Sequence, residues 1–187
     1  MVGTVIKKRF TADEYQRMGQ VGILSEDDRV ELIDGEVVAM TPIGARHNAC
    51  VNHAARALMR AASDDAIVQS QGSVRLDPYS EPEPDLVLLR PRPDFYVSHL
   101  PGADEILLII EIADSSIDYD RDVKTRIYAM SSIPEYWLAD LNANVLWRYS
   151  SPDLGVYQRV EECRRGQSIA PQQLPTCIVP VDVFLIE

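Results

Sequence analysis

The chain has 187 residues and a mass of 21.0 kDa, and we expect residues 1–187 to form a single domain. Hydrophobic residues make up 46% of the chain and charged residues 25%, a globular composition that excludes disordered, collagen-like and coiled-coil proteins. The longest apolar run, Ile106–Ile110, ends at Glu111 and is far shorter than a membrane-spanning helix, so no membrane association is expected.

The net charge of −11 comes from 29 acidic and 18 basic residues. A protein that coats nucleic acid needs a basic surface, so this charge disfavours that class. It does not exclude a nucleic-acid enzyme, because a few local cations suffice for one active site. Three scattered cysteines without a C-x-x-C pair argue against a zinc ribbon or a thioredoxin-type site. Free thiols, together with an N-terminus that shows no apolar signal segment, predict a cytoplasmic protein.

The first 44 residues are expected to form an N-terminal extension with one helix and one hairpin. Thr11 and Glu14 have the spacing of a capping box, which predicts a short helix after Thr11. The segment Arg29–Met40 predicts a β-hairpin, because apolar residues flank the two-residue turn signal at Asp34 and Gly35.

A core over about residues 45–140 is predicted from the periodicity of apolar residues. Ala45–Ser63 carries them at helical spacing, which predicts a helix of about five turns. The following elements are strands over Ile67–Leu76 (with Gly72 as a candidate break), Asp85–Arg90 and Glu105–Ala113, a helix over Asp118–Met130 with Val123, Ile127 and Tyr128 inward, and a strand over Tyr136–Asp140. Glu105–Ala113 is nearly all apolar, which indicates a central strand covered on both faces.

Two C-terminal segments, Val145–Tyr149 and Ile178–Ile186, also read as strands. The core order of helix, strand, strand, strand, helix and strand predicts an α/β fold of the α+β type with one mixed sheet. Three consecutive strands form a meander, the second helix crosses over to the fourth strand with right-handed connectivity, and helices cover both faces.

The candidate catalytic residues are acidic, since nucleophile elbows, phosphate-binding loops and H-E-x-x-H spacings are lacking. Asp85 precedes one predicted strand, and Glu111 lies near the end of the most apolar one. A buried carboxylate is costly unless it is paired, neutralised or bound to metal. Two such carboxylates on neighbouring strands, with the Ile112 carbonyl as a third oxygen donor, predict a site for Mg²⁺ or Mn²⁺. A carboxylate that merely emerges at a strand end, or pairs with arginine, remains the alternative.

Three further residues have both a structural and a functional interpretation. Lys124, 13 positions after Glu111, is either a solvated helix residue or a cation directed at the attacking water or the scissile phosphate. Glu31 lies between two apolar residues of the hairpin, so alternation alone places it on the solvent side. His47 begins the long predicted helix, where spacing alone favours a capping or packing role.

Several strings together resemble the Uma family of restriction endonucleases, within the PD-(D/E)XK nuclease superfamily, over roughly Phe10 to Tyr149. They are Arg29–Glu36, His47 at the head of a helix, Glu83–Val87, Glu111–Ser116, Lys124 with Tyr128, and Pro134–Asp140. The core of that superfamily has the same order of elements, so the resemblance implies a restriction-endonuclease-like fold.

The resemblance also implies a site. Asp85 becomes the aspartate of the "PD" element and Glu111 the acidic residue of the "(D/E)XK" element. The usual lysine position holds Ala113, so Lys124 from the following helix is the expected substitute. Glu31 then completes the acidic cluster, by binding a second metal or by anchoring Lys124, and His47 joins the catalytic set.

The function implied is a Mg²⁺- or Mn²⁺-dependent endonuclease that hydrolyses DNA, with DNA as its partner and a homodimer as its assembly. Ala113 and the acidic net charge favour a second hypothesis, a catalytically degraded nuclease fold that acts as a binding or regulatory module. A third, a metal hydrolase of small phosphodiesters on the same scaffold, also fits the acidic composition.

Overall fold

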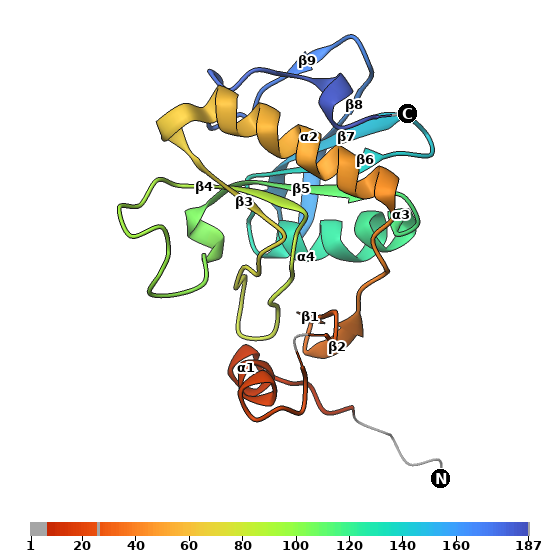
Figure 1. Cartoon of the computed structure of the whole chain (residues 1–187). Coiled ribbons are helices and arrows are strands. Elements are labelled where there is room, and N and C mark those ends of the chain that lie inside the picture. The colour runs from red at the N-terminus through yellow and green to blue at the C-terminus, as the bar shows by residue number, and fades with distance from the viewer. Residues whose placement is uncertain (1–6, 26, 187) are drawn as a thin grey trace.

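A six-stranded mixed sheet lies at the centre of the protein (Figure 1), whose computed structural model describes residues 7–25 and 27–186. Its strands lie in the order β3 (Ile67–Ser70), β4 (Leu86–Leu89), β5 (Ile106–Ala113), β6 (Glu135–Asp140), β7 (Val145–Asp153) and β8 (Val156–Cys163). All neighbouring strands are antiparallel except β5 and β6, which are parallel. The predicted meander and the crossover between parallel strands are therefore confirmed.

Helices cover both faces of this sheet, as predicted. Helix α2 (Ala45–Ala62) packs with the C-terminal segment on one face, and α4 (Thr125–Met130) packs on the other (Figure 1). All eight residues of β5 are buried, which confirms the predicted central strand. The remaining short helices are α3 (Ile117–Tyr119) and the 3-10 turns η1 (Ser63–Asp65), η2 (Ala103–Glu105) and η4 (Val181–Val183).

The predicted helix over Asp118–Met130 begins at Ile117 and is interrupted by a π-helical turn, η3 (Asp120–Lys124). The Thr125 N–H donates to the Asp120 carbonyl five residues back, and the Thr125 hydroxyl donates to the same oxygen over 3.0 Å. Turns of this kind insert one extra residue and often occur at functional sites. Here both Asp120 and Lys124 are buried at the turn.

The N-terminal extension matches its prediction. Helix α1 (Ala12–Gln20) begins at a capping box in which the Glu14 N–H donates to Thr11 Oγ1 over 3.2 Å and the Thr11 N–H donates to the Glu14 carboxylate over 2.9 Å. Strands β1 (Val30–Ile33) and β2 (Glu36–Ala39) form the hairpin. Its turn needs left-handed backbone at two positions, and Gly35 supplies one with φ of 79°.

Two strand predictions need correction, and one strand was not predicted. The strand expected over Ile67–Leu76 ends at Ser70, close to the break considered at Gly72, because Gln71 takes a left-handed conformation with φ of 47° that breaks the extended backbone. Strand β8 was not predicted, because its side chains are mostly exposed and its charged sequence does not alternate, as on an edge strand. The second correction concerns the apolar tail.

The tail, Ile178–Ile186, is not a continuous strand. Only β10 (Val179–Pro180) pairs, with β9 (Ser168–Ile169), and the chain then turns into η4. Most of its apolar residues are instead buried in the core on the α2 face. There the Phe184 ring packs edge-on against the Trp137 ring, with ring centroids 5.6 Å apart. Burial, and not strand pairing, explains that apolar run.

Two smaller expectations concern the cysteines and membrane-spanning helices. Cys50, Cys163 and Cys177 are all free thiols. Of the helices in the described part of the chain, none is long and apolar enough to cross a membrane.

Candidate active site

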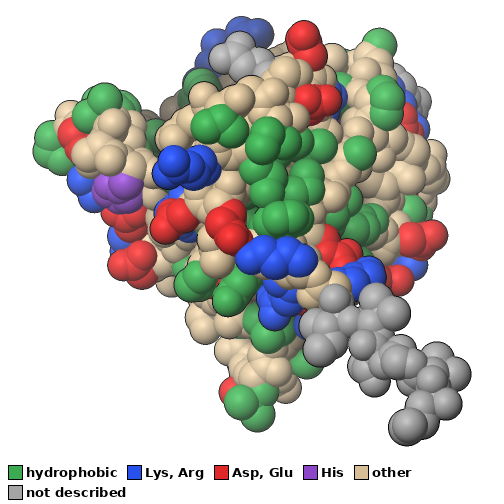
Figure 2. Space-filling view, turned by 90° about the horizontal axis from the view of Figure 1, so that it is seen from below, with side chains coloured by type: hydrophobic (Ala, Val, Ile, Leu, Met, Phe, Trp, Pro, Cys, Tyr) green, Lys and Arg blue, Asp and Glu red, His purple; other side chains and the backbone are tan. Residues whose placement is uncertain are grey.

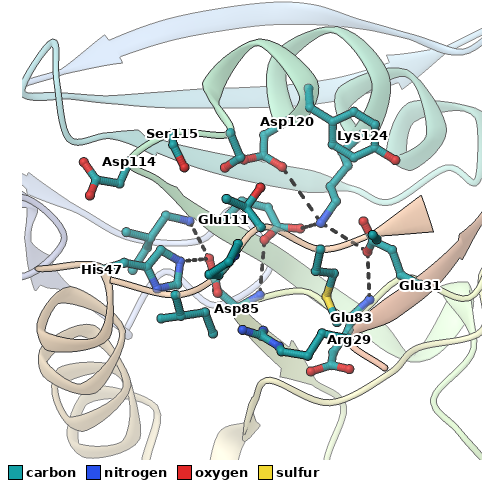
Figure 3. A pocket seen from close by; sticks show the side chains of 18 of the residues that line it. Arg29, Glu31, His47, Glu83, Asp85, Glu111, Asp114, Ser115, Asp120 and Lys124 are labelled. Carbon is teal, nitrogen blue, oxygen red and sulfur yellow. Dashed lines mark hydrogen bonds and ion pairs between the residues drawn. The ribbon is translucent and has the colours of Figure 1, made fainter. Parts of the chain in front are cut away.

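A cavity of about 560 Å³ opens where the hairpin, the N-terminus of α2, the ends of β4 and β5, and the α3–η3 turn meet (Figure 3). Every predicted site residue lines it: Glu31 from β1, His47 from the first turn of α2, Asp85 just before β4, Glu111 and Ile112 from β5, and Lys124 from η3. Five separate elements, distant in sequence, therefore contribute to one site.

Asp85 and Glu111 lie side by side at adjacent strand ends, as the sequence predicts. The Asp85 N–H donates to Glu111 Oε2 over 3.2 Å. One carboxylate oxygen of Asp85, Oδ2, accepts the Ile112 N–H over 2.8 Å and lies 3.0 Å from His47 Nε2. The antiparallel register that sets Leu86 opposite Ile110 brings these groups together.

Glu111 is 4% exposed, and two donors satisfy one of its oxygens. Oε1 accepts from Lys124 Nζ over 3.0 Å and from the Tyr128 hydroxyl over 2.7 Å. Burial raises the pKa of Glu111 above its ordinary value, with Asp85 adding to the rise and Lys124 opposing it. The alternative of a carboxylate that merely emerges at the strand end is wrong, because Glu111 is buried, and its cationic partner is a lysine and not an arginine.

Lys124 is the central cation of the site and is 6% exposed. Its Nζ lies 3.0 Å from Glu111, 3.3 Å from Glu31 and 3.9 Å from Asp120. Burial alone would lower the pKa of Lys124, but the three carboxylates raise it by a larger amount. The pKa of Lys124 therefore stands well above its ordinary value, and the ammonium stays charged. The interpretation of Lys124 as a solvated helix residue is therefore wrong.

Glu31 is 3% exposed, so the solvent-side position inferred from alternation is also wrong. The hairpin is packed on both faces at this point, because Leu32 is fully buried as well. The Lys124 ammonium and the Glu83 N–H, which donates to Glu31 Oε2 over 3.3 Å, compensate the buried carboxylate. The strand period places Glu31 on the face opposite Leu32, and that face borders the cavity instead of solvent.

His47 neither caps nor simply packs. The α2 N-cap is Gly44, and the His47 ring reaches Asp85 instead. Burial lowers the pKa of His47, while the bond to Asp85 and the charges of Asp85, Asp114 and Asp120 raise it, with a net upward shift. Its other ring nitrogen, Nδ1, is buried without a hydrogen-bond partner among residues 7–25 and 27–186.

Asp120 is a site residue that carries no motif in the sequence. It is 4% exposed and accepts a hydrogen bond from Ser116 Oγ over 2.5 Å. Burial raises the pKa of Asp120, and Lys124 opposes that shift. Its spacing of four from Lys124 is the one signal that could have revealed it.

The donor chemistry of this cavity fits a hard divalent cation. Asp85 and Glu111 offer carboxylate oxygens, the type of ligand that Mg²⁺ and Mn²⁺ prefer. Four buried or half-buried carboxyl groups (Glu31, Asp85, Glu111 and Asp120) face one lysine and one histidine, so acidic side chains outnumber basic ones in this cluster. Within the described ranges, however, no three His, Cys, Asp or Glu side chains converge as a ready-made metal site. The lysine ammonium itself lies between Glu31 and Glu111.

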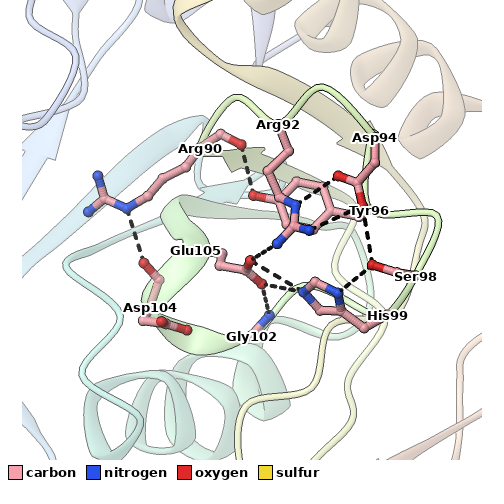
Figure 4. Close-up of polar contacts among 9 residues, drawn as sticks. All are labelled: Arg90, Arg92, Asp94, Tyr96, Ser98, His99, Gly102, Asp104 and Glu105. Carbon is pink, nitrogen blue, oxygen red and sulfur yellow. Dashed lines mark hydrogen bonds and ion pairs between the residues drawn. The ribbon is translucent and has the colours of Figure 1, made fainter.

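A second polar cluster follows β4 and lies outside this cavity (Figure 4). Arg92 pairs with Asp94 over 2.8 Å and with Glu105 over 2.9 Å, and His99 lies 3.0 Å from Glu105. These contacts close the loop between β4 and β5. His99, like His53, has no part in the candidate site.

Comparisons with known proteins agree with the resemblance and the fold. A crystal structure of "a putative nuclease belonging to DUF820 from Anabaena variabilis ATCC 29413" superposes with a TM-score of 0.74 at 14% sequence identity, covering 94% of this chain and 97% of that one. At this identity the match shows the fold alone, a restriction-endonuclease-like one. No curated protein matches the chain. A family model described as "Putative restriction endonuclease" matches residues 12–182, so the chain belongs to the Uma2 family.

Proposed function

We propose that this protein is a metal-dependent endonuclease that hydrolyses phosphodiester bonds of DNA. The observation that carries the proposal is the placement of Asp85, Glu111 and the charged Lys124 in one cavity, with the lysine 3.0 Å from Glu111. Membership of the Uma2 family and the likeness to a nuclease structure support the same class of activity.

Asp85, Glu111 and the Ile112 carbonyl would hold Mg²⁺ or Mn²⁺. When bound, such an ion lowers the pKa of water and offsets negative charge on the phosphate in the transition state. Glu31 serves better as an anchor of Lys124 than as a ligand of a second ion, because its carboxylate already pairs with the ammonium.

The side chains and backbone groups around the two carboxylates have two further roles. Lys124 stays protonated and supplies a fixed positive charge where charge develops on the phosphate or the attacking water. Tyr128 and Lys124 fix one oxygen of Glu111, and the Ile112 N–H and His47 fix one oxygen of Asp85. Ala113, at the usual lysine position, is then compensated by a lysine that reaches the same carboxylate from η3.

The direct test incubates the protein with circular single-stranded DNA or supercoiled plasmid in the presence of Mg²⁺, Mn²⁺ or EDTA, and measures cleavage. We expect cleavage or nicking with either ion and none with EDTA. Asp85→Asn and Lys124→Met should both abolish it, while Lys8→Met, a change at an exposed ion pair with Glu14, should not. Cleavage that persists in EDTA would contradict the proposal.

A second candidate function is a binding or regulatory module on the same fold. Ala113 and the net charge of −11 favour it. DNA binding without cleavage under every metal condition would select this candidate, and cleavage of a short generic phosphodiester but not of DNA would select a small-molecule hydrolase.

Three coarser expectations accompany the proposal. One domain over residues 1–187 predicts a single cooperative unfolding transition. A homodimer predicts twice the monomer mass of 21.0 kDa by light scattering. The cytoplasmic location rests on the free thiols and is tested by fractionation of cells that express the tagged protein.

A further inference from the structure

One part of the cavity lining is apolar. Val38, Met40, Pro42 and Ile43 come from β2 and from the segment that leads into α2, and they line the same cavity as Asp85. A metal site for a phosphate alone has no need of such a surface. Single-stranded nucleic acids bind to apolar and aromatic surfaces through their unstacked bases, so these side chains offer what a base or a sugar would contact.

Arg29 is the second observation. It lines the cavity, its backbone carbonyl accepts the Met40 N–H over 2.8 Å, and its side chain makes no hydrogen bond or ion pair within the described part of the chain (Figure 3). The other two cations of the lining are engaged at close range, Lys124 by Glu111 and His47 by Asp85, whereas Arg29 has only a longer-range attraction, which lowers the pKa of Glu83 against the effect of burial. A guanidinium fork matches two phosphate oxygens, so Arg29 is the cation available to a substrate phosphate.

The charges around the cavity bear on the kind of strand that can enter. The lining carries Glu83, Asp114 and Asp118 besides the acidic residues of the site, and the whole chain has a net charge of −11. A duplex carries one negative charge per about 1.7 Å of axis and a single strand one per about 3.4 Å along its own length. Repulsion therefore disfavours the duplex more, while a cavity of about 560 Å³ has the size of a pocket for one small ligand.

We propose that the cavity takes one unstacked nucleotide of a single strand, with a phosphate on Arg29 and the base or sugar against the surface formed by Val38, Met40 and Ile43. This inference rests on the proposed nuclease function and names its substrate class. Single-stranded DNA, frayed ends and gaps are the substrates, and an intact duplex is a poor one.

The first experiment compares one labelled sequence as a single strand, as a blunt duplex and as a duplex with a single-stranded gap, all with Mn²⁺. We expect kcat/KM for the single strand to exceed that for the blunt duplex by at least about tenfold, and the gapped duplex to be cut in its gap. Equal or faster cleavage of the blunt duplex would overturn the inference and leave the nuclease function standing. No cleavage of any of the three would instead overturn the proposed function.

The second experiment tests the role of Arg29 in holding the phosphate. Arg29→Gln should raise KM for the single strand by about tenfold, the loss typical of one hydrogen-bonded charge, with kcat little changed. Arg29→Lys should recover part of that loss. The matched control is Arg56→Gln, at an exposed arginine of α2 outside the cavity lining. In titrations with salt, Arg29→Gln should reduce the slope of log K against log salt by about 0.7.

The apolar surface needs its own variant, since Arg29 alone does not distinguish a base from a bare phosphate. Met40→Ser should weaken binding of a trinucleotide but not of inorganic phosphate, measured by competition against the labelled strand. Arg29→Gln should weaken both. Binding by Arg29→Gln that matches Arg56→Gln, or equal loss of both ligands in Met40→Ser, would overturn this arrangement.

Discussion

The Lys124 ammonium lies 3.0 Å from Glu111 and 3.3 Å from Glu31, so a single buried cation joins the central strand β5 to the N-terminal hairpin. Lys124 and Asp120 are both part of the π-helical turn, and both are buried there. The hairpin is thus tied to the core through charge as well as through its backbone bridge between Leu32 and Glu81.

Replacing the lysine tests this relationship. Lys124→Met keeps much of the side-chain volume but leaves Glu111 and Glu31 buried without their cation, which should cost about 3 kcal/mol of the free energy of unfolding. Turnover should be lost, while the rise in melting temperature caused by Mn²⁺ should persist, because Lys124 is assigned to the water or the phosphate. Urea titration and thermal melts with and without Mn²⁺ measure both effects.

The control for this variant is Lys8→Met, which removes an exposed pair with Glu14 and should change stability by less than about 0.5 kcal/mol. Full activity in Lys124→Met would remove the residue from the mechanism. A Lys124→Met protein that no longer responds to Mn²⁺ would mean that the lysine organises the ligands themselves.

Metal binding itself should be visible without substrate. An ion that binds only the folded state stabilises it by RT ln(1 + [L]/Kd), which for a Kd of about 1 mM and about 10 mM Mn²⁺ is about 1.4 kcal/mol. In a chain of this size the melting temperature should rise by roughly 3–6 °C. Asp85→Asn should erase that rise, because it removes a ligand charge.

The metal-free form of Asp85→Asn separates two contributions. Loss of the negative charge beside Glu111 relieves repulsion and raises the melting temperature, while loss of the charged partner of His47 lowers it. We expect relief of repulsion to dominate and the variant to melt slightly higher than wild type in EDTA. A variant that is destabilised in EDTA and still gains several degrees with Mn²⁺ would assign Asp85 a structural role and place the metal elsewhere.

Much of this fold could be predicted from the sequence, but only part of the candidate site could. Asp85 and Glu111 could be paired because β4 and β5 are neighbours in both chain and sheet, so strand order alone brings them together. Glu31 could not be placed, because a strand period says which residues share a face and not that both faces are covered. Asp120 depends on a π-helical turn, and single-sequence periodicity does not predict such an insertion.

Strand β8 and the C-terminal tail could not be predicted from the local sequence either, because tertiary packing determines their composition. The β8 edge is exposed and charged, so it lacks the apolar alternation by which strands are recognised. The tail is apolar because it covers α2 and Trp137, a tertiary demand that the local sequence does not distinguish from a strand.

The cluster in Figure 4 predicts how stability responds to acid. The hydrogen bond from Arg92 lowers the pKa of Asp94 to about 2, below its ordinary value of 3.8. A depressed pKa stabilises the folded state above the unfolded-state pKa, and this stabilisation is lost as the pH falls through the folded-state value. The difference in melting temperature between wild type and Asp94→Asn should therefore be present at pH 6 and should vanish between about pH 4 and pH 2.

The control for the acid series is Asp153→Asn, which removes one exposed negative charge at the end of β7, where the Asp153 side chain makes no hydrogen bond or ion pair with the described residues. Arg92→Gln removes the same interaction from the other side together with the ion pair to Glu105, so it should destabilise more at pH 6, and its effect should also shrink toward pH 2. A difference between wild type and Asp94→Asn that grows toward pH 2 would contradict the assignment.

Glu135 tests how the C-terminal segment is held to the sheet. Its carboxylate is 1% exposed and accepts from Trp137 Nε1, Arg148 Nε and the Gln172 N–H, each over 2.7 Å. Glu135→Ala leaves all three donors without this acceptor in a buried place, which should cost about 3–5 kcal/mol of the free energy of unfolding and lower the melting temperature by roughly 6 °C or more.

The matched control is Glu162→Ala, at an exposed pair with Arg164, which should change stability by less than about 0.5 kcal/mol. Glu135 and its three donors do not line the cavity, and Trp137 packs in the core on the α2 face. Glu135→Ala should therefore keep its Mn²⁺-dependent rise in melting temperature. Loss of that rise would show that the contacts of Glu135 also hold the metal ligands in position.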